Sequence, residues 1–108
     1  MTNNRVNSKT IGFVGEEMKL NTLFFLMAQY GGQAVIPISK VCNDYMNLTV
    51  EKFKQKQLSG EIDIPILRLG PNSQKAALGV YIQDLATYID TQRDKAIVEF
   101  KKLSANHS

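Results

Sequence analysis

The chain has 108 residues, of which 44% are apolar, and its 13 basic and 10 acidic side chains leave a net charge of +3. This composition is typical of one small globular domain and is too weakly basic to establish nucleic-acid binding by itself. One Cys and one His exclude a disulfide framework and a Cys/His zinc site, so we expect no metal and no cofactor.

Residues 1–17 are rich in Asn, Ser, Thr and Gly and lack a hydrophobic period, which is typical of a flexible leader. We expect the folded domain over residues 18–93, and a helical extension with a frayed tail over residues 94–108. The most apolar run, Leu23–Ala28, is far shorter than the roughly 20 residues that cross a bilayer. With a single Cys42, which fits a reducing compartment, we expect a cytoplasmic protein with no membrane contact.

The first helix is predicted from Leu20 to about Tyr30. Apolar residues recur there at steps of three and four and form one face, which consists of Leu20, Leu23, Phe24, Met27 and Ala28. Gly31 and Gly32 are expected to end the helix. A short extended segment over 34–37 follows, because the residue before a proline is restricted to extended geometry.

Two short helices with a break of about three residues come next. The first is predicted over Lys40–Met46 with Ser39 as its N-cap, and the second over Val50–Ser59 with Thr49 as its N-cap. Gly60 is expected to end the second helix. This spacing is typical of a helix-turn-helix.

Two β-rich runs, 64–69 and 77–82, flank a turn cluster over 70–75 and predict a hairpin. A long helix over Gln83–Leu103 is predicted to close the chain, with Asp84 in its first turn. The fold class is therefore α+β. The element order predicts a small winged helix-turn-helix: a helix, a short strand, the helix-turn-helix, a hairpin wing and a long C-terminal helix.

In such modules the second helix of the motif enters the major groove of DNA. On the Val50–Ser59 helix, Val50 and Phe53 are predicted to face the core. The opposite face is predicted to carry no acid, and its DNA-binding candidates are Thr49, Lys52, Gln55, Lys56 and Ser59, with Lys54 on the flank. Lysines neutralise phosphates or donate to guanine, and glutamine pairs with adenine. The alternative is an ordinary solvated helix face.

The expected wing carries hydrogen-bond donors and no carboxylate, which suits phosphate and minor-groove contacts. Its candidate residues are Arg68, Asn72, Ser73, Gln74 and Lys75. The alternative is a plain polar turn, and the spacing does not decide between the two. Glu61 and Asp63, at the entry to the wing, are expected to point away from DNA or to orient a neighbouring lysine.

No catalytic constellation is visible, so we expect no enzyme. Cys42 lies in an apolar stripe and is interpreted as a small buried hydrophobe. Asp84 and Asp90 are predicted on different faces of one helix and do not form a catalytic pair. The last helix continues past the reach of a small core, and we expect Ile97, Phe100 and Leu103 to contact another subunit in a homodimer or higher oligomer.

Several segments resemble the pyocin activator (PrtN-type) family of bacterial and prophage transcription regulators, over about Leu20 to Arg93. The resemblance rests on 21–24, 34–37, 41–42, 44–45, 60–61, 65–69, 73–75 and 84–90, of which Ser73-Gln74-Lys75 with Asp84–Asp90 is the most specific part. Relatives carry a proline just inside the third helix, where this chain has Val50, and this departure leaves the base preference open.

The resemblance implies an activator of bacteriocin or prophage-type genes that binds promoter or operator repeats in double-stranded DNA. RNA polymerase is a further candidate partner of such an activator. It also implies a winged helix like those of excisionases and MerR-like proteins. Two alternatives stay open: an excisionase-like factor that bends DNA, and an anti-repressor module that binds a protein.

Overall fold

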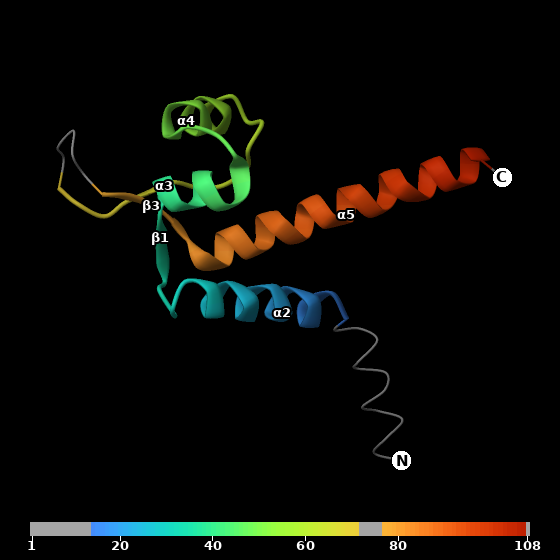
Figure 1. The fold of residues 1–108 in the computed structure, drawn as a ribbon, viewed down its shortest axis with the longest axis horizontal. Helices are drawn as coiled ribbons and strands as arrows, with labels where there is room; N and C mark the ends of the chain where they lie inside the picture. The colour runs from blue at the N-terminus through green and yellow to red at the C-terminus, as the bar shows by residue number, and fades with distance from the viewer. Residues whose placement is uncertain (1–13, 72–76, 108) are drawn as a thin grey trace, which may run out of the picture.

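The computed structural model describes residues 14–71 and 77–107 and has an α+β fold. Helix α2 (Val14–Gln29) and the long helix α5 (Ile82–His107) lie side by side. Helices α3 and α4 lie on the other side of α5, and a small antiparallel sheet lies at one end (Figure 1). The order of the elements therefore agrees with the predicted α+β class.

Helix α2 begins at Val14, before the predicted start at Leu20, and residues 1–13 lie outside the described chain. The predicted apolar face of this helix is partly wrong. Leu26 and Tyr30 are buried, whereas Phe24, Phe25 and Met27 are exposed. The helix is apolar on several sides, so its docking against α5, and not its period, selects the buried stripe.

The glycines after α2 end it as expected. Gly31 and Gly32 both have positive φ, at 64° and 79°, and the Gly32 amide donates to the Met27 carbonyl at 2.8 Å. Glycine adopts this left-handed geometry without the steric cost that a Cβ imposes. The chain then turns back into strand β1 (Val35–Pro37), which confirms the predicted extended segment.

The next helix begins earlier than predicted. Helix α3 (Ile38–Val41) follows directly from Pro37, which takes the N-cap position, so the prediction of Ser39 as N-cap is wrong. Proline lacks an N–H and its fixed φ, here −53°, suits the entry to a helix. The helix continues as the π-helical segment η1 (Cys42–Met46).

Asn47, with a left-handed φ of 53°, ends η1 and turns the chain toward α4 (Val50–Leu58). The Thr49 hydroxyl accepts a hydrogen bond from the Lys52 amide at 3.2 Å, which confirms the predicted N-cap. Gly60 has a φ of 85° and ends the helical segment, as predicted.

Strands β2 (Leu67–Arg68) and β3 (Leu78–Tyr81) are shorter than the predicted runs. They pair antiparallel, and within the described chain the sheet has the order β1-β3-β2. In its register Ile36 faces Val80 and Pro37 faces Gly79.

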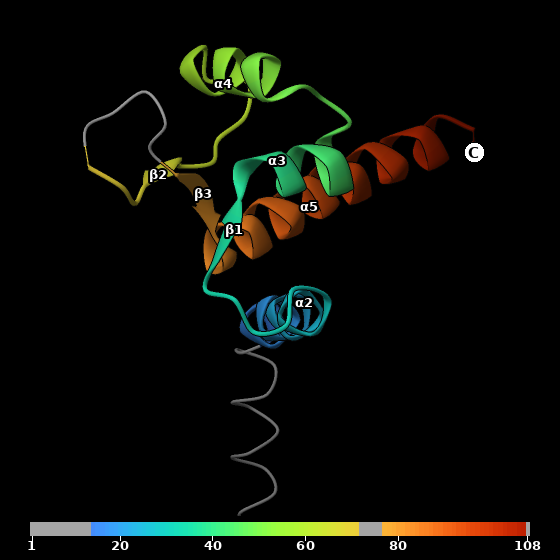
Figure 2. The same cartoon turned by 60° about the vertical axis from the view of Figure 1, so that its left-hand side comes forward.

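Helix α5 follows β3 without a linker and extends beyond the predicted Leu103. The helix continues to His107, where the description ends. The Thr22 hydroxyl of α2 donates to Asp90 Oδ1 of α5 at 2.6 Å. Figures 1 and 2 both show the end of α5 projecting away from the other elements.

The core lies where the sheet, α3, α4 and the first turns of α5 meet. Its fully buried side chains are Leu26, Ile36, Val41, Phe53, Ile64, Val80 and Leu85. Phe53 thus anchors α4 through one face, as predicted. No helix in residues 14–71 and 77–107 is long and apolar enough to span a membrane.

Candidate nucleic-acid interface

Helix α4 lies at the edge of the molecule (Figures 1 and 2). Phe53 is buried, and most of the other side chains of the helix are exposed. The candidates that are exposed on and beside this helix are Thr49, Lys52, Lys54, Gln55 and Ser59. The hydroxyl of Thr49 caps the helix, and the Ser59 hydroxyl donates to the Lys56 carbonyl at 3.0 Å. Lys52, Lys54 and Gln55 are therefore the exposed side chains with long polar reach.

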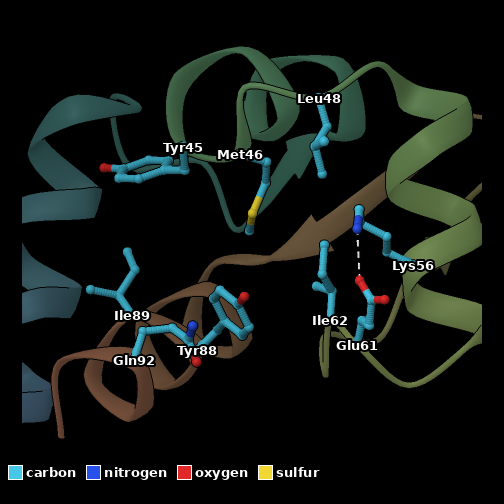
Figure 3. Close-up of a pocket in the computed structure, with 9 residues that line it drawn as sticks. All are labelled: Tyr45, Met46, Leu48, Lys56, Glu61, Ile62, Tyr88, Ile89 and Gln92. Carbon is cyan, nitrogen blue, oxygen red and sulfur yellow. Dashed lines mark hydrogen bonds and ion pairs between the residues drawn. The ribbon is translucent and has the colours of Figure 1, made fainter. Parts of the chain in front are cut away.

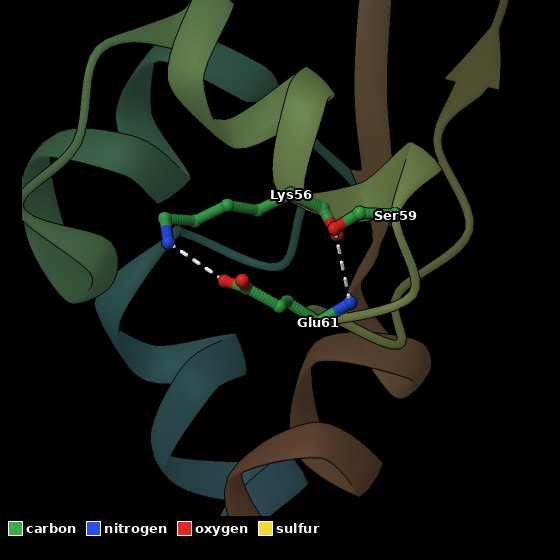
Figure 4. Close-up of polar contacts among 3 residues, drawn as sticks. All are labelled: Lys56, Ser59 and Glu61. Atoms are coloured by element: carbon green, nitrogen blue, oxygen red, sulfur yellow. Dashed lines mark hydrogen bonds and ion pairs between the residues drawn. The ribbon is translucent and has the colours of Figure 1, made fainter.

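Lys56 differs from the other lysines of α4 because it forms an ion pair with Glu61. Its Nζ lies 2.7 Å from Glu61 Oε2, and its side chain is only 34% exposed (Figure 4). The Glu61 amide in turn donates to the Ser59 hydroxyl at 3.5 Å. The hydrogen bond and the charge of Lys56 lower the pKa of Glu61 below its ordinary value. The expectation that Glu61 orients a neighbouring lysine is thus met.

Two exposed residues of α4 do not fit the predicted basic face. Glu51 lies in the first turn, so the exposed surface is not free of acids as predicted. Leu58 is 84% exposed, the highest value among the large apolar side chains whose burial the structure describes. At 100° per residue Leu58 lies on the same side as Gln55 and Glu51, a signal that the helical period already contained. An apolar side chain in this position suits a thymine methyl group.

The predicted wing is described only at its base. Arg68 is exposed on β2, and the Leu69 amide donates to the Ala77 carbonyl at 2.9 Å, which closes the last described pair of the hairpin. The tip residues Asn72, Ser73, Gln74 and Lys75 lie outside the described residues.

A pocket of about 490 Å³ lies beneath the end of α4, between η1 and α5 (Figure 3). Its lining mixes apolar and polar side chains: Tyr45, Met46, Leu48, Lys56, Glu61, Ile62, Tyr88, Ile89 and Gln92. Lys56 and Glu61 meet at one side of it, so the ammonium of Lys56 is drawn toward this pocket and away from the outer surface of α4.

Cys42 is buried, as predicted, and burial raises the pKa of its thiol, so the reactive thiolate is disfavoured. Its Sγ lies 3.9 Å from the Thr49 carbonyl. The described residues hold no group of three or more His, Cys, Asp or Glu side chains that suits a metal ion.

The predicted oligomerisation residues lie along the outer half of α5. Ile97 is half-buried, while Phe100 and Leu103 are largely exposed at 68% and 56%. The structure thus places the two outer residues on the surface of the protomer.

A protein-family sequence model described as "Pyocin activator protein PrtN" matches residues 22–96, which is more than half of the chain. The match runs from the middle of α2 through the first half of α5 and includes all of α4. No curated protein and no solved structure shows significant similarity to the chain.

Proposed function

The chain belongs to the pyocin activator protein PrtN family, and from this membership we propose that it is a winged helix-turn-helix protein that binds double-stranded DNA at promoters. The family name implies activation of pyocin genes, a regulatory role and not an enzymatic one. In this proposal α4 is the recognition helix and the β2–β3 hairpin is the wing.

The observation that carries the proposal is the exposed cationic surface of α4. Phe53 anchors one side of the helix in the core, while Lys52, Lys54 and Gln55 extend from exposed positions. A left-handed residue, Asn47, sets the turn between η1 and α4. This arrangement supports insertion of α4 into the major groove.

Each exposed residue has a distinct proposed role. Lys52 and Gln55 reach base edges, with lysine donating to guanine and glutamine pairing with adenine. Lys54 and Arg68 contact phosphates, as does Lys75 at the tip of the wing, where Asn72, Ser73 and Gln74 position the contact. Thr49 and Ser59 support the helix ends. Lys56, paired with Glu61, contributes less than its charge suggests.

The test is a mobility shift with genomic fragments, followed by footprinting and by titration at several salt concentrations. We expect Lys54→Ala to weaken binding to all sequences alike and to reduce the log–log salt slope by about 1. Gln55→Ala is expected to relax the preference at one base pair with an unchanged slope.

Unchanged binding by a Lys52→Ala, Lys54→Ala double variant would show that α4 is not the recognition helix. If no fragment shifts at low salt, the protein is instead a protein-binding regulator. If the bound fragment is strongly bent in a circular-permutation assay and no promoter is activated, the excisionase-like role replaces the proposed one. Contact with RNA polymerase is proposed only for the activator and is tested by promoter-dependent transcription with purified polymerase.

A further inference from the structure

The middle of the exposed side of α4 is a stripe of three side chains without a lysine. Glu51, Gln55 and Leu58 are exposed and follow one another at steps of four and three residues. At 100° per residue they lie within an arc of about 60°. The buried Phe53 lies on the opposite side of the helix, so the stripe faces directly away from the core.

The lysines of α4 lie beside this stripe and not on it. Lys54 lies about 40° from its edge on one flank, and Lys52 lies about 60° from its edge on the other. Lys56 lies farther round the helix, is half-buried and is paired with Glu61. Across its exposed side the helix thus presents one cation, then the stripe, then a second cation.

A stripe between two cations is complementary to the major groove of DNA. Phosphates line both edges of the groove and base edges form its floor, so the flanking lysines reach the phosphates or the outer base edges while the stripe faces the floor. From Glu51 to Leu58 the stripe is about 10 Å long, which matches about three base-pair steps. An acid is compatible with this place, because cytosine presents a hydrogen-bond donor in the floor.

Leu58 is the apolar member of the stripe. A lone exposed leucine is common on protein surfaces and by itself indicates nothing. Leu58 differs because it lies on the stripe, three residues and about 4.5 Å along the axis after Gln55, which is close to one base-pair step. The apolar group that base pairs present in the floor of the major groove is the C5 methyl of thymine.

We propose that Leu58 is a specificity-determining residue, which packs against the C5 methyl of a thymine next to the base pair that Gln55 contacts. The inference rests on the proposed function, because it requires that α4 enters the major groove. It adds to that function a preference for thymine at one position, which none of the lysines can supply.

Deoxyuridine in place of thymine tests this contact, because it removes the C5 methyl alone. The site is first located by footprinting on genomic fragments, and each thymine in it is then replaced singly. Binding is measured by fluorescence anisotropy. We expect one position for each bound α4 at which the wild type loses about threefold to fourfold in affinity, as expected for one methyl group returned to water. At that position Leu58→Ala should show no further loss.

On the unmodified site Leu58→Ala should bind about threefold or more weakly than the wild type. Its log–log salt slope should stay unchanged, because no phosphate contact is lost. Leu103→Ala, at an exposed leucine near the far end of α5, is the matched control and is expected to behave as the wild type on both DNAs. Because Leu58 is largely exposed, circular dichroism should show that its alanine variant is folded.

Three results would overturn the inference. Equal effects of every deoxyuridine on the wild type and on Leu58→Ala would do so and would leave DNA binding by α4 intact. Unchanged binding of Leu58→Ala to the unmodified site, with a loss of transcription activation alone, would mean that Leu58 contacts a protein. If no fragment is bound at low salt, the proposed function fails and the inference fails with it.

Discussion

The ammonium of Lys56 and the carboxylate of Glu61, 2.7 Å apart, connect the last turn of α4 to the loop that leads to the hairpin. The pair spans only five residues, but Gly60 turns the chain between them with a φ of 85°. One of the lysines of the proposed recognition helix is therefore neutralised before any DNA binds. The number of lysines on α4 overstates the charge that is free to meet a phosphate.

Removing the charge of Glu61 should release Lys56 for DNA. Lys56 lowers the pKa of Glu61, so this carboxylate is ionised at neutral pH, and the substitution Glu61→Gln is needed to neutralise it. We expect Glu61→Gln to strengthen non-specific DNA binding and to steepen the log–log salt slope by up to about 1. Fluorescence anisotropy at several salt concentrations measures both. Asp63→Asn, an equal change in net charge at another exposed acid, is the control. Equal effects of the two variants would mean that only the net charge matters.

Tyr30 should make the fold sensitive to alkaline pH. Its hydroxyl donates to Asp44 Oδ2 at 2.7 Å, and burial, followed by Asp44, raises the pKa of Tyr30 above its ordinary value. The contribution to stability is therefore complete below the unfolded pKa of about 10 and is lost as the pH rises toward the folded pKa.

We expect the free energy of unfolding to fall above about pH 10, and to fall less steeply in Tyr30→Phe. At neutral pH the same substitution should cost about 1 kcal/mol through the lost hydrogen bond. Urea unfolding across this pH range measures the effect, with Tyr81→Phe, an exposed tyrosine, as the control. Parallel curves for Tyr30→Phe and the wild type would contradict the assignment.

Thr49→Ala should destabilise the protein by about 1 kcal/mol, because the Lys52 amide loses its side-chain acceptor. Thr49→Ser retains the hydroxyl and is expected to unfold at nearly the wild-type denaturant concentration. If the two variants lose the same stability, the methyl group of Thr49 and not its cap contributes the energy.

The sequence predictions were correct where a feature depends on residues close together in the sequence. The Thr49 cap and the glycine stops at Gly31 and Gly60 depend on neighbouring residues, and these were predicted correctly. The prediction of Ser39 as N-cap was wrong because the helix already begins after Pro37, two residues earlier.

Features that depend on distant contacts were missed. The buried side of α2 depends on α5, which lies more than fifty residues away, as the bond from Thr22 to Asp90 illustrates. The contact between Lys56 and Glu61 was anticipated only in kind: the sequence suggested that Glu61 orients a neighbouring lysine, while the loop conformation after Gly60 decides which one. The exposure of Leu58, by contrast, follows from the helical period alone, which places it on the side of α4 opposite Phe53.

A side chain at Gly79 should destabilise the protein, because its neighbours on β1 are too close. A Cβ there would collide with Val35 Cγ1 and would lie 3.0 Å from the Ile36 carbonyl oxygen. We expect Gly79→Ala to cost about 1–3 kcal/mol by overpacking. In a Val35→Ala background the same substitution should cost less, since one of the two collisions is gone. Thermal unfolding of the four variants of this cycle measures the coupling, and strictly additive losses would exclude a direct clash.

The direct passage from β3 into α5 has a mechanical consequence. Tyr81 ends the strand, Ile82 begins the helix, and the Ile82 amide donates to the Ala34 carbonyl beside β1 at 2.8 Å. An inserted residue would rotate the helix by about 100° and turn Leu85 out of the core. Because no residue separates β3 from α5, a displacement of the strand is expected to displace the start of the helix with it.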